Sequence, residues 1–151
     1  MTKDINHLNL ERITLGGEIA EKNILKALRS KFPNSKIVHI YASTEAGVGF
    51  SVQDCKSGFP LEYLKSSVDG VQLRVEDGKL FIKSKSLSNG YVKKDLPITS
   101  EGFLDTGDLV EISGDRVIFL GRASGLINIG GNKVFPEEVE SSLMTHSEVK
   151  D

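Results

Sequence analysis

The segment from residue 12 to residue 41 constrains the fold most strongly, because it has the order strand, helix, strand. Apolar residues between positions 19 and 32 recur at helical spacing, and Pro33 ends this predicted helix. Residues 36–41 are rich in β-branched side chains and predict the second strand. A βαβ unit places its two strands in parallel, so residues 1–50 are predicted to be α/β, at the edge of a parallel sheet.

The middle of the chain, residues 51–121, has the short alternating runs typical of a small, mostly antiparallel sheet or β-barrel. Asp77-Gly78 is the strongest hairpin signal, and Gly114-Asp115 joins two further runs in the same manner.

Past Gly121 the pattern changes. Pro136 and the two glutamates after it predict a helix start, so residues 126–151 are expected to open an α+β domain that the end of the chain cuts short.

Composition gives no reason to expect a nucleic-acid or membrane partner. The formal net charge is −2, and no apolar run approaches the roughly 20 residues that span a bilayer. The first residues lack the apolar core of a signal peptide, so a cytoplasmic protein is expected. The three histidines have no metal-ligand spacing, and His39, inside an apolar run, is predicted to be a satisfied strand residue.

Two short segments follow predicted strands at the edge where α/β sheets place ligands. Residues 41–45, Tyr-Ala-Ser-Thr-Glu, could stack a base, bind a phosphate oxygen and hold a divalent cation. The alternative is an ordinary strand end whose Ser and Thr cap the next turn. Gly16-Gly17-Glu18 would let backbone approach a planar ligand, or would simply start the helix.

The segment from residue 102 to residue 140 combines an acid, a cation and two glycine turns. Asp108 is predicted to be an exposed carboxylate just before a strand, able to accept paired hydrogen bonds from sugar hydroxyls. Arg122 would lie near it across a hairpin, as a polar clamp or as a surface ion pair of about 0–1 kcal/mol. Ser124-Gly125 is predicted to be a flexible break, and Gly130-Gly131 a close backbone approach or a plain turn.

Five groups of residues share their order with the AMP-forming acyl-CoA synthetases of the adenylate-forming superfamily, and the resemblance covers nearly the whole chain from Arg12 onward. These groups are residues 16–18, 41–45, 102–108, 121–122 and 127–140. In that family a carboxylic acid attacks the α-phosphate of ATP to give an acyl-adenylate, and a thiol then takes the acyl group. The resemblance implies a small carboxylic acid, ATP or AMP, Mg²⁺, and either coenzyme A or a carrier-protein thiol as partners.

The resemblance also implies roles for individual residues. The nucleotide-binding set would be Gly16, Gly17, Glu18, Tyr41, Thr44, Asp108 and Arg122. Tyr41 would stack on adenine, Asp108 would bind the ribose hydroxyls, and Thr44 and Glu45 would be catalytic, at the α-phosphate and as the Mg²⁺ ligand respectively.

Further along the chain the resemblance implies a domain movement. Residues 122–125 would form a hinge near Ser124, and Gly130 and Gly131 would line the passage for the pantetheine of coenzyme A. Ser124 and Asn128 depart from the charged residues usual at those positions, and Ala42 replaces a usual glycine.

The family's glycine-rich phosphate loop with its lysine has no match, because residues 83–86 lack the glycines that such a loop needs. The lysine that drives adenylation would also lie beyond Asp151. The chain is therefore expected to be a piece of a ligase: the end of the large domain (1–50), its β-barrel subdomain (51–121), the hinge and the start of the small domain. A non-catalytic nucleotide-binding or scaffold module is the alternative.

Without that loop and lysine, we expect little or no adenylation by these residues alone. The measurement is ATP–pyrophosphate exchange with a panel of carboxylic acids. Exchange above background with any acid would contradict the expectation.

Overall fold

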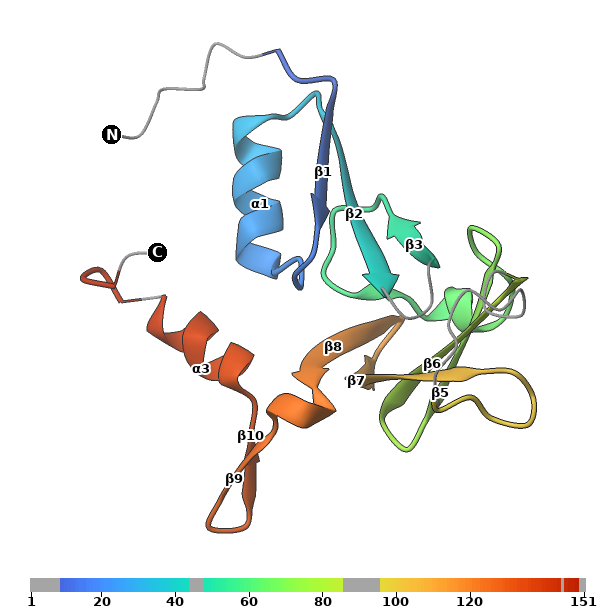
Figure 1. The fold of residues 1–151 in the computed structure, drawn as a ribbon. Helices are drawn as coiled ribbons and strands as arrows, with labels where there is room; N and C mark the ends of the chain where they lie inside the picture. Colours follow the sequence, from blue (N-terminus) through green and yellow to red (C-terminus); the bar gives the residue numbers. More distant parts are fainter. Residues whose placement is uncertain (1–8, 44–47, 86–95, 145, 150–151) are drawn as a thin grey trace.

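The computed structural model describes residues 9–43, 48–85, 96–144 and 146–149, and the described part is mostly β-sheet (Figure 1). No helix in these ranges is long and apolar enough to cross a membrane. The strands and α-helices, in chain order, are β1 (Arg12–Gly16), α1 (Lys22–Lys31), β2 (Lys36–Ser43), β3 (Val48–Val52), β4 (Phe59–Pro60), β5 (Val71–Glu76), β6 (Lys79–Ser84), β7 (Leu104–Ser113), β8 (Arg116–Arg122), β9 (Ile127–Ile129), β10 (Asn132–Val134) and α3 (Pro136–Leu143).

The predicted βαβ unit is confirmed. β1 and β2 pair in parallel, α1 lies alongside them, and β3 pairs antiparallel with the other side of β2 (Figure 1). The helix begins at Lys22 and not at residue 19, because Gly17 has φ +93° and Glu21 is still extended. Ala20, Leu25 and Ile37 form the small apolar core between helix and sheet.

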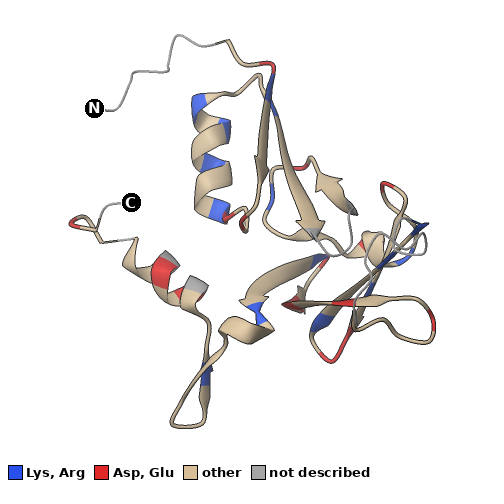
Figure 2. Cartoon of the chain, in the orientation of Figure 1, with Lys and Arg blue, Asp and Glu red and all other residues tan. Residues whose placement is uncertain are grey.

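Helix α1 carries basic residues on its exposed side, which Figure 2 shows as blue bands. Arg29 and Lys31 lie in its last turn, where a cation is favourable beside the negative end of the helix dipole. The Arg29 guanidinium also donates to the carbonyls of Pro33 and Ser35, at 3.0 and 2.9 Å. These bonds fix the chain reversal that leads into β2.

The second sheet has the strand order β4-β8-β7-β6-β5, with every pair antiparallel. The predicted hairpin at Asp77-Gly78 is confirmed, since both residues have positive φ, at 48° and 74°, as a type I′ turn requires. The Gly114-Asp115 turn joins β7 to β8 as predicted. Among the described residues the strand order is open, with β4 and β5 at its two edges, so the predicted antiparallel sheet or barrel is a curled half-barrel.

The last elements extend from the end of β8. A 3-10 turn (Ala123–Gly125) leads into the β9–β10 hairpin and then α3, whose first residue is Pro136 as predicted. The hairpin projects away from both sheets in Figure 1. Several apolar side chains of this part are exposed: Ile127, Ile129, Val139 and Leu143.

Aromatic rings join the two sheets into one core. Phe50 on β3 is buried and contacts the rings of Tyr41, Phe59 and Tyr63 at centroid distances of 5.2, 5.0 and 6.0 Å. Phe59, from β4, contacts Phe119 of β8 at 5.7 Å. Because aromatic side chains bury large apolar areas, this cluster makes the βαβ unit and the half-barrel pack as one body.

Arg116 fixes the loop that connects the two sheets. Its guanidinium is buried, pairs with Asp54, and donates to the carbonyls of Lys56, Ser57 and Gly58 at 3.0, 2.7 and 3.0 Å. Because a guanidinium has five donors, this one arginine can bond three neighbouring carbonyls of the loop. The loop therefore holds Phe59 where it meets Phe50.

His39 lies on β2, as predicted, but it is not fully satisfied. Its Nε2 atom is buried and has no hydrogen-bond partner among the described residues. Burial lowers the pKa of this histidine from its ordinary value of 6.5, although Asp54 opposes the shift. The imidazole is therefore held neutral, and the prediction of a satisfied histidine is wrong at this nitrogen.

Removing the ring of Phe59 should test the shared core. Phe59→Ala is expected to lower the free energy of unfolding by about 3–5 kcal/mol, because a fully buried ring leaves a cavity between the sheets. Ile112→Ala, at a 56% exposed position of β7, should change it by less than about 0.5 kcal/mol. Urea denaturation measures both; similar effects would contradict a core centred on the ring cluster.

Acidification should destabilise the protein through His39. The pKa of His39 is lower in the folded protein than in the unfolded chain, so the unfolded chain takes up the proton first as the pH falls. The free energy of unfolding is therefore unaffected by His39 above pH 6.5 and decreases as the pH falls below that value. His39→Gln should therefore lose less stability than wild type between about pH 7.5 and about pH 5.5. The exposed His146→Gln control should behave like wild type. Equal pH dependence in the His39 variant and wild type would exclude this role.

Candidate functional site

Tyr41 lies near the carboxyl end of β2 and points into the junction of the two sheets. Its ring stacks with Phe50 and with Phe119, at centroid distances of 5.2 and 5.3 Å and interplanar angles of 21° and 9°. Its hydroxyl donates a hydrogen bond of 2.5 Å to Asp108 Oδ2. Burial, and then the hydrogen bond to Asp108, raise the pKa of this hydroxyl far above its ordinary value.

Asp108 is buried and lies within β7, so two features of the prediction are corrected: the acid is not exposed, and it does not precede the strand. Alternate residues of β7 from Leu104 to Val110 face the core, and this alternation carries Thr106 and Asp108 inward. The strand was expected to start at residue 109, but it begins five residues earlier. The longer strand explains the burial of the carboxylate.

The backbone next to Asp108 forms a β-bulge. Gly107 has φ +73°, and the β7–β8 register shifts between Leu109 and Val110. The Thr106 hydroxyl donates to the Leu80 carbonyl at 2.8 Å and accepts from the Asp108 amide at 3.1 Å. A bulge of this kind redirects a side chain without ending the sheet, and here it directs Asp108 towards β2 and β8.

Arg122 pairs with Asp108 across the β7–β8 ladder, as both the polar-clamp and the ion-pair interpretations predict. Its Nη1 atom donates to Asp108 Oδ1 at 2.9 Å and to the Thr106 carbonyl at 3.0 Å. The side chain of Asp108 is 11% exposed and that of Arg122 is 51% exposed. The pair therefore joins a nearly buried acid to a cation at the surface.

The Gly16–Glu18 segment lies at the same end of the βαβ unit as Tyr41. Gly16 ends β1 and is in register with Ile40, the residue before Tyr41. Gly17 and Glu18 are exposed. The parallel pairing thus brings the predicted glycine segment and Tyr41 to one edge, to which β7 and β8 add Asp108 and Arg122.

Other predicted residues lie elsewhere or outside the described ranges. Gly130 and Gly131 form the turn of the β9–β10 hairpin, with φ of 60° and 94°, and this turn extends away from the sheets (Figure 1). Ser124 lies in the 3-10 turn after β8, so the predicted flexible break has regular structure. Thr44 and Glu45 lie outside the described residues. No cluster of three or more possible metal ligands occurs among the residues that are described.

The residues that support the site were not predicted from the sequence. Thr106 was not identified as a partner of Asp108, and Phe50 and Phe119 were not identified as partners of Tyr41. Asp105 was missed as well: its Oδ1 atom accepts from the Gly107 amide at 2.9 Å. The alternation of β7 could have indicated that Thr106 and Asp108 share a face, but the strand boundary was placed too late.

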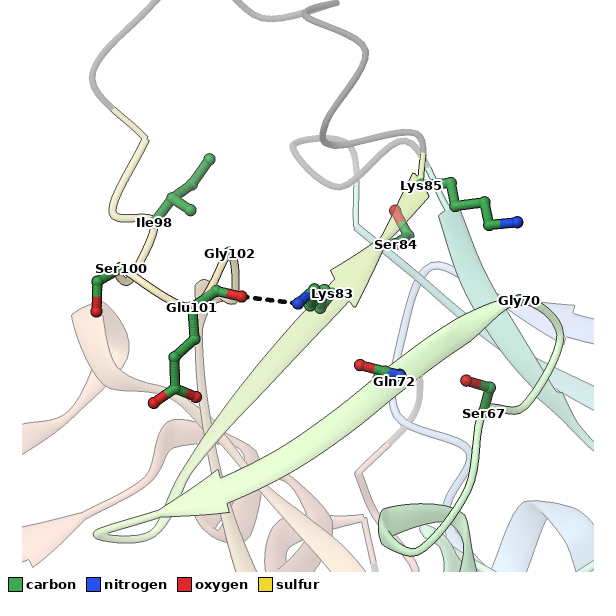
Figure 3. Close-up of a pocket in the computed structure, with 10 residues that line it drawn as sticks. All are labelled: Ser67, Gly70, Gln72, Lys83, Ser84, Lys85, Ile98, Ser100, Glu101 and Gly102. Carbon is green, nitrogen blue, oxygen red and sulfur yellow. Dashed lines mark hydrogen bonds between the residues drawn. The ribbon is translucent and has the colours of Figure 1, made fainter.

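A separate hollow of about 530 Å³ lies on the half-barrel, lined by β5, β6 and the segment that precedes β7 (Figure 3). Lys83 extends across it and donates to the Glu101 carbonyl at 2.8 Å. Ser67, Gln72 and Ser100 also line it. None of the residues predicted for nucleotide binding is among the described residues of this hollow.

Comparisons with known proteins identify relatives of this chain in sequence and in fold. The sequence matches no protein-family model. It is 30% identical over 157 residues to 4-coumarate–CoA ligase-like 8 of Arabidopsis thaliana, across 94% of this chain and 28% of that protein. It is also 30% identical to peroxisomal OPC-8:0-CoA ligase 1 of the same plant, across 95% of this chain and 30% of that protein.

A solved structure shares the fold. ATP-bound MatB from Rhodopseudomonas palustris superimposes with a TM-score of 0.72 at 24% identity, over 91% of this chain and 30% of that one. The chain thus spans less than a third of each of these three proteins. With its strand order, its motifs in sequence and these relatives, the chain belongs to the adenylate-forming superfamily, with the AMP-forming acyl-CoA synthetases.

Proposed function

We propose that this chain carries the adenosine side of the nucleotide site of an AMP-forming acid–thiol ligase. The observation that supports the proposal best is that Tyr41 and Arg122, from two different strands, both donate to the carboxylate of Asp108 on a third strand. A carboxylate held by two donors is a strong acceptor for a vicinal pair of hydroxyls, and the ribose of AMP has such a pair.

The reaction proposed for the whole enzyme has two half-reactions. A carboxylate oxygen of the acid attacks the α-phosphorus of ATP and pyrophosphate leaves, which gives a mixed anhydride with AMP. A thiol then attacks the acyl carbon and AMP leaves. Coenzyme A is the proposed thiol because the two plant relatives are named CoA ligases. In this reaction Asp108 and Arg122 would hold the nucleoside, while the chemistry occurs at the α-phosphate.

Adenine would lie beside Tyr41 and the Gly16–Glu18 segment. The Tyr41 ring already stacks with two phenylalanine rings, so we infer that adenine contacts its edge or replaces one of these contacts. Gly17, with φ +93° and no atom within 4 Å of the position a Cβ would take, leaves open space there. Thr44 and Glu45 remain predicted contacts of the α-phosphate and Mg²⁺.

We infer that the boundary between the two domains lies at residues 122–125. The observation in its favour is the change from the seven-residue strand β8 to a short 3-10 turn and an exposed hairpin. Gly130-Gly131, at the tip of that hairpin, would approach the pantetheine chain if the small domain rotates about Ser124. The positive φ of both glycines suits a narrow turn that brings backbone close to a ligand.

The proposal predicts that AMP binding depends on Asp108. Asp108→Asn keeps the shape of the side chain but removes its charge and one acceptor, so it should weaken AMP binding at least about tenfold in calorimetric titration. Glu111→Gln, at an exposed acid of the same strand, is the matched control and should bind AMP like wild type.

Equal affinity in wild type and Asp108→Asn would show that the ribose assignment is wrong. A different result would favour the non-catalytic nucleotide-binding module. In that case wild type binds AMP, but a longer ligase that contains this chain shows no acid-dependent pyrophosphate exchange.

A further inference from the structure

We propose that the Tyr41 hydroxyl is a positioning group of the ribose site, which acts through the Asp108 carboxylate and not only through the aromatic ring. This inference rests on the proposed function and adds a specific role to one atom of it. The hydroxyl fixes the plane of the carboxylate so that one acceptor position on each oxygen stays available to a ribose hydroxyl.

The geometry divides the carboxylate between two donors. Oδ2 accepts from Tyr41 at 2.5 Å and Oδ1 accepts from Arg122 at 2.9 Å. A carboxylate has about four lone-pair positions, two on each oxygen. One position on each oxygen is therefore left after these two bonds, which matches the two adjacent hydroxyls of a ribose.

The two donors come from different sheets. Tyr41 belongs to β2 of the βαβ unit, while Arg122 belongs to β8 of the half-barrel. A carboxylate on a single strand can rotate about its own side-chain bonds. Donors on two sides restrict this rotation, so the acceptor is arranged before the ligand arrives and less entropy is lost on binding.

Packing alone does not explain the hydroxyl. The contacts of Tyr41 with Phe50 and Phe119 are ring contacts, which a phenylalanine would also make. A phenol taken into an apolar cluster costs free energy unless its hydroxyl is bonded, and here the hydroxyl donates to the carboxylate of Asp108. The hydroxyl thus adds a contact with Asp108 that a phenylalanine could not make.

A competing arrangement predicts the opposite effect. If the ribose had to displace the Tyr41 hydroxyl, this contact would block the site and its removal would tighten binding. If the hydroxyl positions Asp108, its removal weakens binding. The sign of one measurement therefore separates the two roles.

The experiment compares the full chain with Tyr41→Phe and Tyr63→Phe, by calorimetric titration with AMP, 2′-deoxy-AMP and 3′-deoxy-AMP. Tyr63 is the matched control because its ring, like that of Tyr41, packs on Phe50, while its hydroxyl only reaches the Ser51 carbonyl at 3.4 Å. Tyr41→Phe should weaken AMP binding on the order of tenfold. The preference of wild type for AMP over the deoxy analogues should shrink in this variant, which a purely structural defect would not cause.

Three outcomes overturn the inference. Unchanged or tighter AMP binding by Tyr41→Phe overturns it, as does an undiminished preference for AMP over the deoxy analogues. If Asp108→Asn still weakens AMP binding in that case, the positioning role fails and the proposed function stands. If wild type and Asp108→Asn bind AMP with equal affinity, both the positioning role and the proposed function fail.

A second measurement needs no variant and covers the case in which Tyr41→Phe does not fold. Ultraviolet absorbance titration of wild type follows tyrosine ionisation with and without AMP. The pKa of Tyr41 is raised by burial and by its bond to Asp108, so positioning predicts that this resistance to ionisation persists with AMP bound. Ionisation at lower pH in the presence of AMP would show displacement and overturn the inference.

Discussion

The contact between the βαβ unit and the half-barrel is the interaction on which the rest of this structure depends. Neither sheet is large: in the part of the chain that the structure describes, the first has three strands and the second five. Phe50 and Phe59 are both buried where the two sheets meet, and Arg116 ties down the loop that connects them. Because apolar burial is the main favourable term in folding, the junction stabilises both sheets at once.

The same junction creates the site. Tyr41 uses its ring in the aromatic cluster and its hydroxyl on Asp108, so one side chain belongs to both the core and the polar centre. Asp108 is nearly buried, and such an acid needs bonded partners to stay charged at low cost. Tyr41 and Arg122 supply them from either side. A displacement of the sheets would therefore change both the stability and the arrangement of the carboxylate.

Much of the fold could be predicted from the sequence, and the failures have physical causes. The βαβ order, the Asp77-Gly78 turn and the Pro136 helix start follow from local periodicity and turn chemistry, and all three are confirmed. The start of β7 was predicted five residues too late, because Gly107 and Asp108 have low strand propensity. Pairing of β7 with β6 on one side and β8 on the other outweighed this low propensity and buried Asp108. His39 was predicted to be satisfied because local sequence does not reveal the partner of a side-chain nitrogen.

The sequence by itself determined the order of the elements, the family resemblance and the candidate residues, because these depend on local spacing and residue type. Only the tertiary structure decided that Asp108 is buried, that its two oxygens accept from Tyr41 and Arg122, and that the glycine hairpin lies away from them. The hairpin pattern already predicted Arg122 near Asp108, but Tyr41 lies 67 residues before Asp108 in the chain. Tyr41 meets this pair because aromatic packing between the two sheets fixes a distance that no local pattern contains.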